Sequence, residues 1–192
     1  KIFVVEGVEA DDVIGTLATE AEQKGISTII STGDKDLAQL VTKNIKLVNT
    51  MKNEVLDIKG VEKKFGVKPE QIVDYLALVG DTSDNIPGVE KVGPKTAVNW
   101  LTEHNDIDTI IEKADEFKGK VGEYLRAGIE QLKLSRQLTE IKKDVKLDFG
   151  IEDLAVGDRD EKRLHELFTK LEFKTLLKEA PKASKPKSSS KY

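Results

Sequence analysis

Residues 27–36 read Ser-Thr-Ile-Ile-Ser-Thr-Gly-Asp-Lys-Asp, a short β-branched run that two carboxylates follow almost at once. The run Ser27–Ser31 predicts a buried strand, because isoleucine and threonine pack well on a pleated surface. Similar runs predict two more strands, and helical spacing predicts the helices between them: strands Ile2–Val5 and Ile45–Val48, helices Asp11–Lys24 and Asp36–Val41. Strands that alternate with helices predict an α/β fold with a mainly parallel sheet and flanking helices.

The pattern changes after residue 58, where helical spacing replaces the strand signals. Helices are predicted at Val61–Phe65, Glu70–Val79, Pro94–Glu103, Ile107–Lys113, Val121–Leu138 and Asp160–Leu177, with a loop at Gly80–Gly93. From Pro181 the chain is rich in lysine and serine, a composition typical of disorder. We therefore divide the chain into an α/β core (1–58), a helical region (59–178) and a basic tail or linker (179–192).

The composition excludes several classes of site. There is no cysteine among the 192 residues, which excludes disulfides, zinc–thiolate sites and thiol nucleophiles. The two histidines, His104 and His165, lie far apart, so a histidine metal site or a Ser/His triad is disfavoured. No apolar run approaches the roughly 20 residues of a membrane span, and no secretory signal is visible. We expect a cytoplasmic protein, and its net charge of −4 does not argue against nucleic acid, because acids and lysines can cluster separately.

Carboxylates follow two of the predicted strands, with Glu9, Asp11 and Asp12 after the first and Asp34 and Asp36 after the second. Carboxyl ends of parallel strands meet at one edge of a sheet, so these five acids should converge. Like charges at that spacing need cations, and oxygen ligands without histidine or cysteine favour Mg²⁺ or Mn²⁺. Two such ions about 4 Å apart activate water and stabilise the leaving oxygen in phosphodiester hydrolysis.

Each acidic motif also has a simpler interpretation. Asp11 and Asp12 suit the first turn of a helix, and Asp34 and Asp36 suit a turn and a helix N-cap. The third motif, Asp81-Thr82-Ser83-Asp84, could form a capping and turn cluster after the preceding helix. The joint placement of the motifs favours a metal site, but by itself it names no reaction.

The second informative stretch is Ile86-Pro87-Gly88-Val89-Glu90-Lys91-Val92-Gly93-Pro94-Lys95-Thr96-Ala97. Glycines let a backbone approach phosphate closely, and the N-terminus of the following helix offers free N–H groups. The stretch therefore predicts a clamp for the phosphate backbone that does not recognise base sequence, through Gly88, Lys91, Gly93, Lys95 and Thr96. It is not a P-loop, because no Gly-Lys-Ser/Thr closes the motif. An ordinary helix–turn–helix connection is the alternative.

Together these stretches resemble the 5′ nuclease domain of bacterial DNA polymerase I, within the flap endonuclease superfamily. The resemblance covers residues 1 to about 178, and four ordered motifs carry it: residues 7–15, 31–36, 76–89 and 92–97. It implies a PIN-like nuclease core followed by a helix–three-turn–helix DNA-binding region. It also implies a 5′–3′ exonuclease or flap endonuclease that removes primers and repairs DNA.

The resemblance assigns roles to individual residues. Glu9 and Asp11 would bind a first metal ion, and Asp34, Asp36 and Asp84 a second, with Asp34 and Asp36 counted as catalytic. Asp12 and Asp81 would act from a second shell or through water. A potassium ion would bind the backbone carbonyls of Leu78, Val79, Pro87, Val89 and Val92. The partners would be 5′-flap, nicked or gapped duplex DNA and RNA primers annealed to DNA, bound by a monomer.

The chain departs from the family pattern at its start. Members of the family carry about a hundred further residues upstream, with a central strand, two more aspartates and a helical arch. We therefore interpret the chain as a fragment that begins at Lys1 and has weak or no nuclease activity alone. A polymerase portion could follow it. Two other functions stay open: a non-catalytic binder of DNA structures, and a small-molecule phosphatase using Asp34. Metal-dependent cleavage of branched DNA separates all three.

Overall fold

The computed structural model describes the backbone of residues 1–179 and the side chains of residues 1–178. Its contacts group Ile2–Asp153 into one compact unit, and Lys1 with the residues from Leu154 onward into a second. The domain boundary expected at residue 58 stays a prediction. The expected basic tail, residues 179–192, lies outside the described residues except for the backbone of residue 179.

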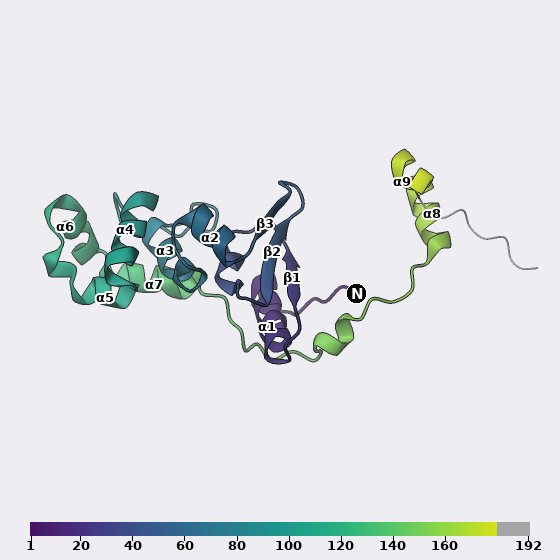
Figure 1. Ribbon diagram of the computed structural model, residues 1–192, viewed down its shortest axis with the longest axis horizontal. Coiled ribbons are helices and arrows are strands. Elements are labelled where there is room, and N and C mark those ends of the chain that lie inside the picture. The colour runs from purple at the N-terminus through teal and green to yellow at the C-terminus, as the bar shows by residue number, and fades with distance from the viewer. Residues whose placement is uncertain (180–192) are drawn as a thin grey trace, which may run out of the picture. The chain divides into compact units, whose positions relative to one another are not determined.

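The first unit contains a three-stranded sheet in the order β1-β2-β3 (Figure 1). Strands β1 (Thr28–Ser31) and β2 (Ile45–Asn49) are parallel, with Ile30 opposite Leu47, as the sequence predicts. Strand β3 (Glu54–Leu56), which the sequence analysis did not predict, is antiparallel to β2. Within the described residues the sheet is therefore mixed rather than mainly parallel.

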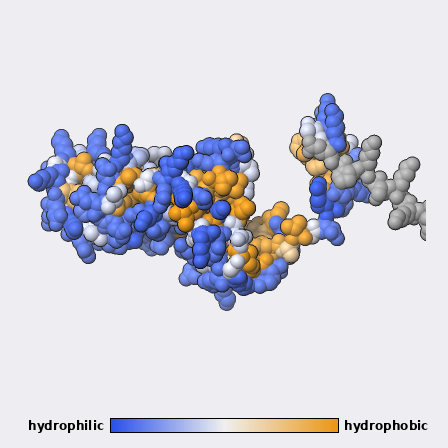
Figure 2. All heavy atoms as spheres, viewed as in Figure 1, coloured by the Kyte–Doolittle hydropathy of each residue, from blue (hydrophilic) through white to orange (hydrophobic). Residues whose placement is uncertain are grey.

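One face of this sheet is buried and the other is open. Ile30, Leu47 and Leu56 share the buried face and are at most 8% exposed. Helix α1 (Ala10–Gln23) packs against β1, and the 3₁₀ helix η1 (Asp36–Leu40) packs against β2. On the other face Ile29 is 70% exposed, and Figure 2 shows an apolar area over the sheet. Burial of one large aliphatic side chain stabilises a fold by about 1.5–3 kcal/mol, so the covered face supplies the sheet's stability.

The expected strand at Ile2–Val5 is wrong. These residues form no regular structure, and Ile2 and Val4 are about nine-tenths exposed. A strand exists only where a neighbouring strand completes its hydrogen bonds, and no described strand pairs with this segment. Phe3 instead stacks on Phe149, with ring centroids 4.1 Å apart.

Helix α1 is held along its length by a segment from the far end of the unit. Asp12 Oδ1 accepts a hydrogen bond from the backbone N–H of Lys142 (2.9 Å), and Thr16 Oγ1 accepts one from Val145 (3.1 Å). Gly15 lies between these contacts, and a Cβ there would be 2.6 Å from a methyl carbon of Ile141. The glycine therefore lets the segment lie directly on the helix.

The helical region follows, with its main helices gathered at one side of the sheet in Figure 1. The elements are α2 (Ile58–Phe65), η2 (Pro69–Gln71), α3 (Ile72–Val79), α4 (Pro94–His104), α5 (Ile107–Glu112), η3 (Ala114–Glu116), α6 (Gly119–Ala127) and α7 (Ile129–Thr139). The single helix expected at Val121–Leu138 is two helices, because the chain leaves helical geometry at Gly128. The buried α3 packs against α4 and α7. Its Asp74 binds Arg136 of α7 at 2.9 Å.

The second unit contains α8 (Glu161–Lys170) and α9 (Lys174–Glu179), where one helix was expected over Asp160–Leu177. Asp160 caps α8 by accepting a hydrogen bond from Arg163 N. The break falls at Glu172, whose φ is +56°, a value that a continuous helix cannot contain. No helix in the described part of the chain is long and apolar enough to cross a membrane.

Candidate metal centre and phosphate-binding loop

The turn after β1 positions the second acidic motif through its own hydrogen bonds. Thr32 Oγ1 accepts from the Asp34 N–H, and Asp34 Oδ1 accepts from the Asp36 N–H, both at 3.0 Å. Asp36 is also the first residue of η1. The turn interpretation of these acids therefore holds locally, whereas the N-cap of η1 is Lys35 and no side chain caps it. The turn leaves one buried oxygen of the Asp36 carboxylate without a partner.

Carboxylates from two distant segments of the chain meet beside this turn. Oxygen atoms of Asp36, Asp81 and Asp84 lie within 4.8 Å of one another. Asp36 Oδ1 is buried and has no hydrogen-bond partner. Burial, together with the charges of Asp34, Asp81 and Asp84, raises the pKa of Asp36 to about 7. A buried oxygen without a donor, in a group of like charges, fits a divalent cation that binds oxygen ligands.

Asp81 differs from its neighbours because it has a cationic partner. Its side chain is 4% exposed, and Oδ2 lies 2.6 Å from Lys35 Nζ. Its Oδ1 accepts a hydrogen bond from the backbone N–H of Ser83 at 2.9 Å. Burial alone would raise the pKa of Asp81, but the Lys35 ammonium and the Ser83 N–H hold it below the ordinary value. Asp81 is therefore ionised across the neutral range.

The first acidic motif lies at the start of α1 and extends the same negative field. Asp11 is half-buried, and its pKa is raised by burial and then by the charges of Asp34 and Glu9. Asp84 also contributes, so the first motif lies within electrostatic range of the cluster.

Asp12 departs from the expected group of ligands. One of its oxygens accepts from Lys142 N, and the other lies 3.9 Å from Lys142 Nζ. Its side chain therefore ties α1 to the segment after α7. This contact gives Asp12 a structural part, and its expected role beside the metal ions, in the second shell or through water, stays a prediction.

Two glycines hold the third acidic motif against the glycine-rich loop. A Cβ at Gly88 would be 2.5 Å from the backbone nitrogen of Gly80, and one at Gly80 would be 2.7 Å from the carbonyl oxygen of Ile86. Both have positive φ, a conformation that glycine adopts without strain. Asp81 and Ile86 exchange two backbone hydrogen bonds, at 2.8 and 2.7 Å. We call this close backbone contact, Gly80–Asp81 against Ile86–Gly88, the glycine clasp.

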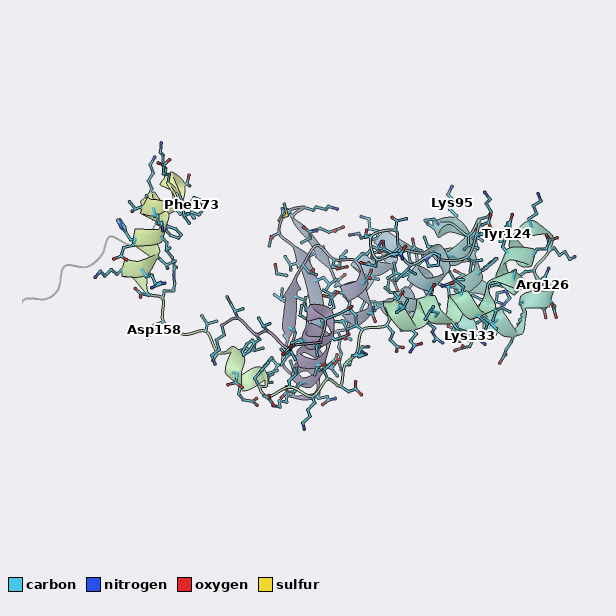
Figure 3. The ribbon with its side chains drawn as sticks, turned by 180° about the vertical axis from the view of Figure 1, so that it is seen from behind. Lys95, Tyr124, Arg126, Lys133, Asp158 and Phe173 are labelled. Carbon is cyan, nitrogen blue, oxygen red and sulfur yellow. The ribbon has the colours of Figure 1, made fainter. Side chains whose placement is uncertain are left out.

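The predicted phosphate clamp lies directly beyond this clasp. Gly93 precedes α4, and no side chain caps the helix. A Cβ at Gly93 would meet nothing within 4 Å, so the approach to the first turn is open. Lys91 is exposed with a φ of +64°, and Lys95 points away from the helices in Figure 3. Lys95 and half-buried Thr96 offer the first backbone N–H groups after Pro94, which has none.

Of the carbonyls expected to bind potassium, at least two are already hydrogen-bond acceptors. Leu78 O accepts from Val89 N at 2.9 Å, and Val89 O accepts from Val92 N at 3.0 Å. A carbonyl oxygen has two lone pairs, so these bonds are compatible with a cation. The potassium site, which also includes the carbonyls of Val79, Pro87 and Val92, remains a prediction.

Sequence reasoning missed one member of the site, Lys35, which stands between the two acids of its motif. Its pairing with Asp81 joins positions far apart in the chain, so only its place inside an acidic motif could have drawn attention to it.

The fold and the site define a class: an α/β core with a carboxylate centre, joined to helices that present a glycine-rich loop. Two family models match the chain. "5'-3' exonuclease, N-terminal resolvase-like domain" matches residues 1–66, and "5'-3' exonuclease, C-terminal SAM fold" matches residues 67–162. The chain belongs to this 5′–3′ exonuclease family.

Relatives and solved structures agree with this assignment. A 5'-3' exonuclease of Aquifex aeolicus is 43% identical over 94% of this chain and 62% of its own length. DNA polymerase I of Pseudomonas aeruginosa is 46% identical over 95% of this chain and 21% of its own length. The chain thus spans under two thirds of the first relative and about a fifth of the second. The T5 D15 protein, crystallised with metal ions, is 26% identical with a TM-score of 0.68, over 71% of this chain and 52% of that one.

Proposed function

We propose that this chain supplies metal-binding and DNA-binding parts of a 5′ nuclease that hydrolyses DNA phosphodiesters at 5′ ends and flaps. The observation that carries the proposal is the meeting of Asp36, Asp81 and Asp84 within 4.8 Å, with a buried oxygen of Asp36 lacking a partner. Family membership supports the reaction class, and the T5 D15 enzyme has been seen in a pseudo-enzyme–product complex with DNA and metal ions.

In this proposal the acids hold two divalent ions, Mg²⁺ or Mn²⁺. Asp36 and Asp84, with Asp34 beside them, hold one, and Glu9 and Asp11 contribute to the other. When bound, a pair of such ions activates water and stabilises the leaving oxygen. The chain's own part is to collect the carboxylates. The turn bonds from Thr32 to Asp36 fix one side of the centre, and the glycine clasp fixes the other.

The helix–three-turn–helix element grips the duplex away from the cut. Lys91 and Lys95 neutralise phosphates, and the uncapped start of α4 offers backbone N–H donors to a phosphate oxygen. Such contacts recognise no base sequence, which suits an enzyme that recognises DNA structure. A potassium ion on the carbonyls between α3 and α4 would strengthen the same grip.

The test separates cleavage from binding. Asp36→Ala in the complete gene product should abolish Mg²⁺-dependent cleavage of a 5′-flap substrate while changing duplex affinity less than threefold, because the acid lies outside the clamp. Asp57→Ala, which removes the N-cap of α2 and no acid of the proposed metal site, is the matched control and should keep activity. Collapse of DNA binding in the Asp36 variant would mean that the acid is structural. Wild-type binding without any cleavage would favour a non-catalytic DNA-structure binder.

A further inference from the structure

Lys35 is the only cation that the described ion pairs place on the carboxylate cluster. Its Nζ lies 2.6 Å from Asp81 Oδ2, and its side chain is 41% exposed while the partner is 4% exposed. The lysine therefore reaches from the surface to a buried carboxylate. It occupies one oxygen of the cluster of Asp36, Asp81 and Asp84, of which the proposed function assigns Asp36 and Asp84 to a divalent ion.

The surroundings of Lys35 leave it room to move. It lines a hollow of about 600 Å³ with Val79, Gly80, Asp81 and Pro87. It also lines a smaller hollow on the side of Thr32 and Asp34. The Lys35 side chain therefore borders an open hollow into which its flexible four-carbon stem can swing away from Asp81.

Besides Asp81, two further negative charges lie close to this ammonium, those of Asp36 and Asp84. Burial would lower the pKa of Lys35, but its hydrogen bond and charge interaction with Asp81, and the charges of Asp36 and Asp84, raise it. Lysine is therefore fully charged in the neutral range. A divalent ion on Asp36, Asp81 and Asp84 would meet a fixed positive charge on the Asp81 oxygen.

We propose that Lys35 is a resident cation of the carboxylate cluster, which keeps the acids assembled and which a divalent ion must displace from Asp81. The inference rests on the proposed metal site and adds a positioning residue to it. Because the divalent ion must displace the Lys35 ammonium, the cluster binds the ion more weakly than it would without the lysine. Lys35 therefore sets the concentration of divalent ion at which the site becomes occupied.

Metal binding without DNA tests this inference. Mn²⁺ affinity is measured by calorimetry at pH 8 on the full chain, for wild type, Lys35→Met and Lys35→Arg. Lys35→Met should bind Mn²⁺ about tenfold more tightly, since one close unit charge at a part-buried site is worth that order of magnitude. Lys35→Arg, which keeps the ion pair, should stay within about threefold of wild type.

The sign of the change distinguishes displacement from a structural brace. If Lys35 only braces the loop, Lys35→Met loosens Asp81 and Mn²⁺ binding weakens, which overturns the inference. Lys133→Met is the matched control, because Lys133 pairs with Glu130 at 2.9 Å on α7 and lines no hollow with the acids of the cluster. An equal gain in that variant would show an effect of net charge alone and would also overturn it. If no protein binds Mn²⁺, the metal site itself fails, and the proposed function fails with it.

Discussion

Replacement of Asp36 by asparagine should stabilise the metal-free protein. The pKa of Asp36 is raised from 3.8 to about 7, because burial and three neighbouring carboxylates oppose its charge. Each pH unit corresponds to about 1.36 kcal/mol, which gives an upper limit of about 4 kcal/mol. The side chain is partly exposed and solvent screens its neighbours, so we expect about 1–2 kcal/mol at pH 8. In a chain of this size that is about 2–8 °C in Tm.

The stability difference between wild type and Asp36→Asn should depend on pH, and the raised pKa of Asp36 determines its direction. Below pH 4 the wild-type acid is protonated in both folded and unfolded states, so the two proteins should be equally stable. Between pH 4 and pH 7 the unfolded state loses the proton first, and wild-type stability falls relative to Asp36→Asn. Above pH 7 the difference should be constant.

Thermal unfolding in EDTA at low salt, from pH 4 to pH 8, measures the difference. Added Mn²⁺ should reverse the order, because a ligand at a hundred times its Kd stabilises the wild type by about 2.7 kcal/mol while the variant has lost a carboxylate ligand. The reasoning is refuted if the variant is less stable than wild type in EDTA at pH 8, or if the difference does not vary with pH.

Four further outcomes follow from the structure. Mn²⁺ affinity, measured by calorimetry, should fall by up to about tenfold per pH unit below pH 7, because Asp36 must lose its proton to bind. Gly88→Ala should cost more than about 1 kcal/mol in urea unfolding, since its Cβ would meet the Gly80 nitrogen at 2.5 Å, whereas Gly93→Ala should be near neutral. Arg136→Ala should cost about 2–3 kcal/mol in the same assay, because it leaves Asp74 buried without its cation; retention of full stability would show that the pair is dispensable. Lys95→Ala should weaken duplex binding equally for all sequences and lower the salt slope by about one, as fluorescence anisotropy can show.

Much of the fold could be predicted because its signals are local. Strands β1 and β2 are short apolar runs, and α1 has a continuous apolar stripe ended by Gly25. Strand β3 has only three residues, and its extended form depends on pairing with β2. The strand predicted at Ile2–Val5 is wrong for the opposite reason. Its apolar pattern suits a strand, but no described strand pairs with it. Pairing is a property of two segments, so one segment alone cannot show it.

The same distinction applies to the site. The acids at Asp34, Asp36, Asp81 and Asp84 could be chosen from motifs, because each motif is contiguous. The tie between Asp12 and Lys142 joins residues 130 positions apart, and no local pattern indicates that Asp12 also binds the segment after α7. Lys35 was overlooked for a related reason, since its partner Asp81 lies on a different segment.

The glycine clasp has a mechanical consequence. On one side it carries Asp81, which belongs to the carboxylate cluster, and on the other it leads through Val89 into the loop that starts α4. If the proposed function holds, the grip on the duplex and the point of hydrolysis are parts of one short, stiff piece of backbone. The glycine clasp then fixes the distance between the phosphates that the loop binds and the phosphodiester that is cut. A substitution that loosens the glycine clasp should therefore produce cleavage at several neighbouring positions before it lowers the cleavage rate.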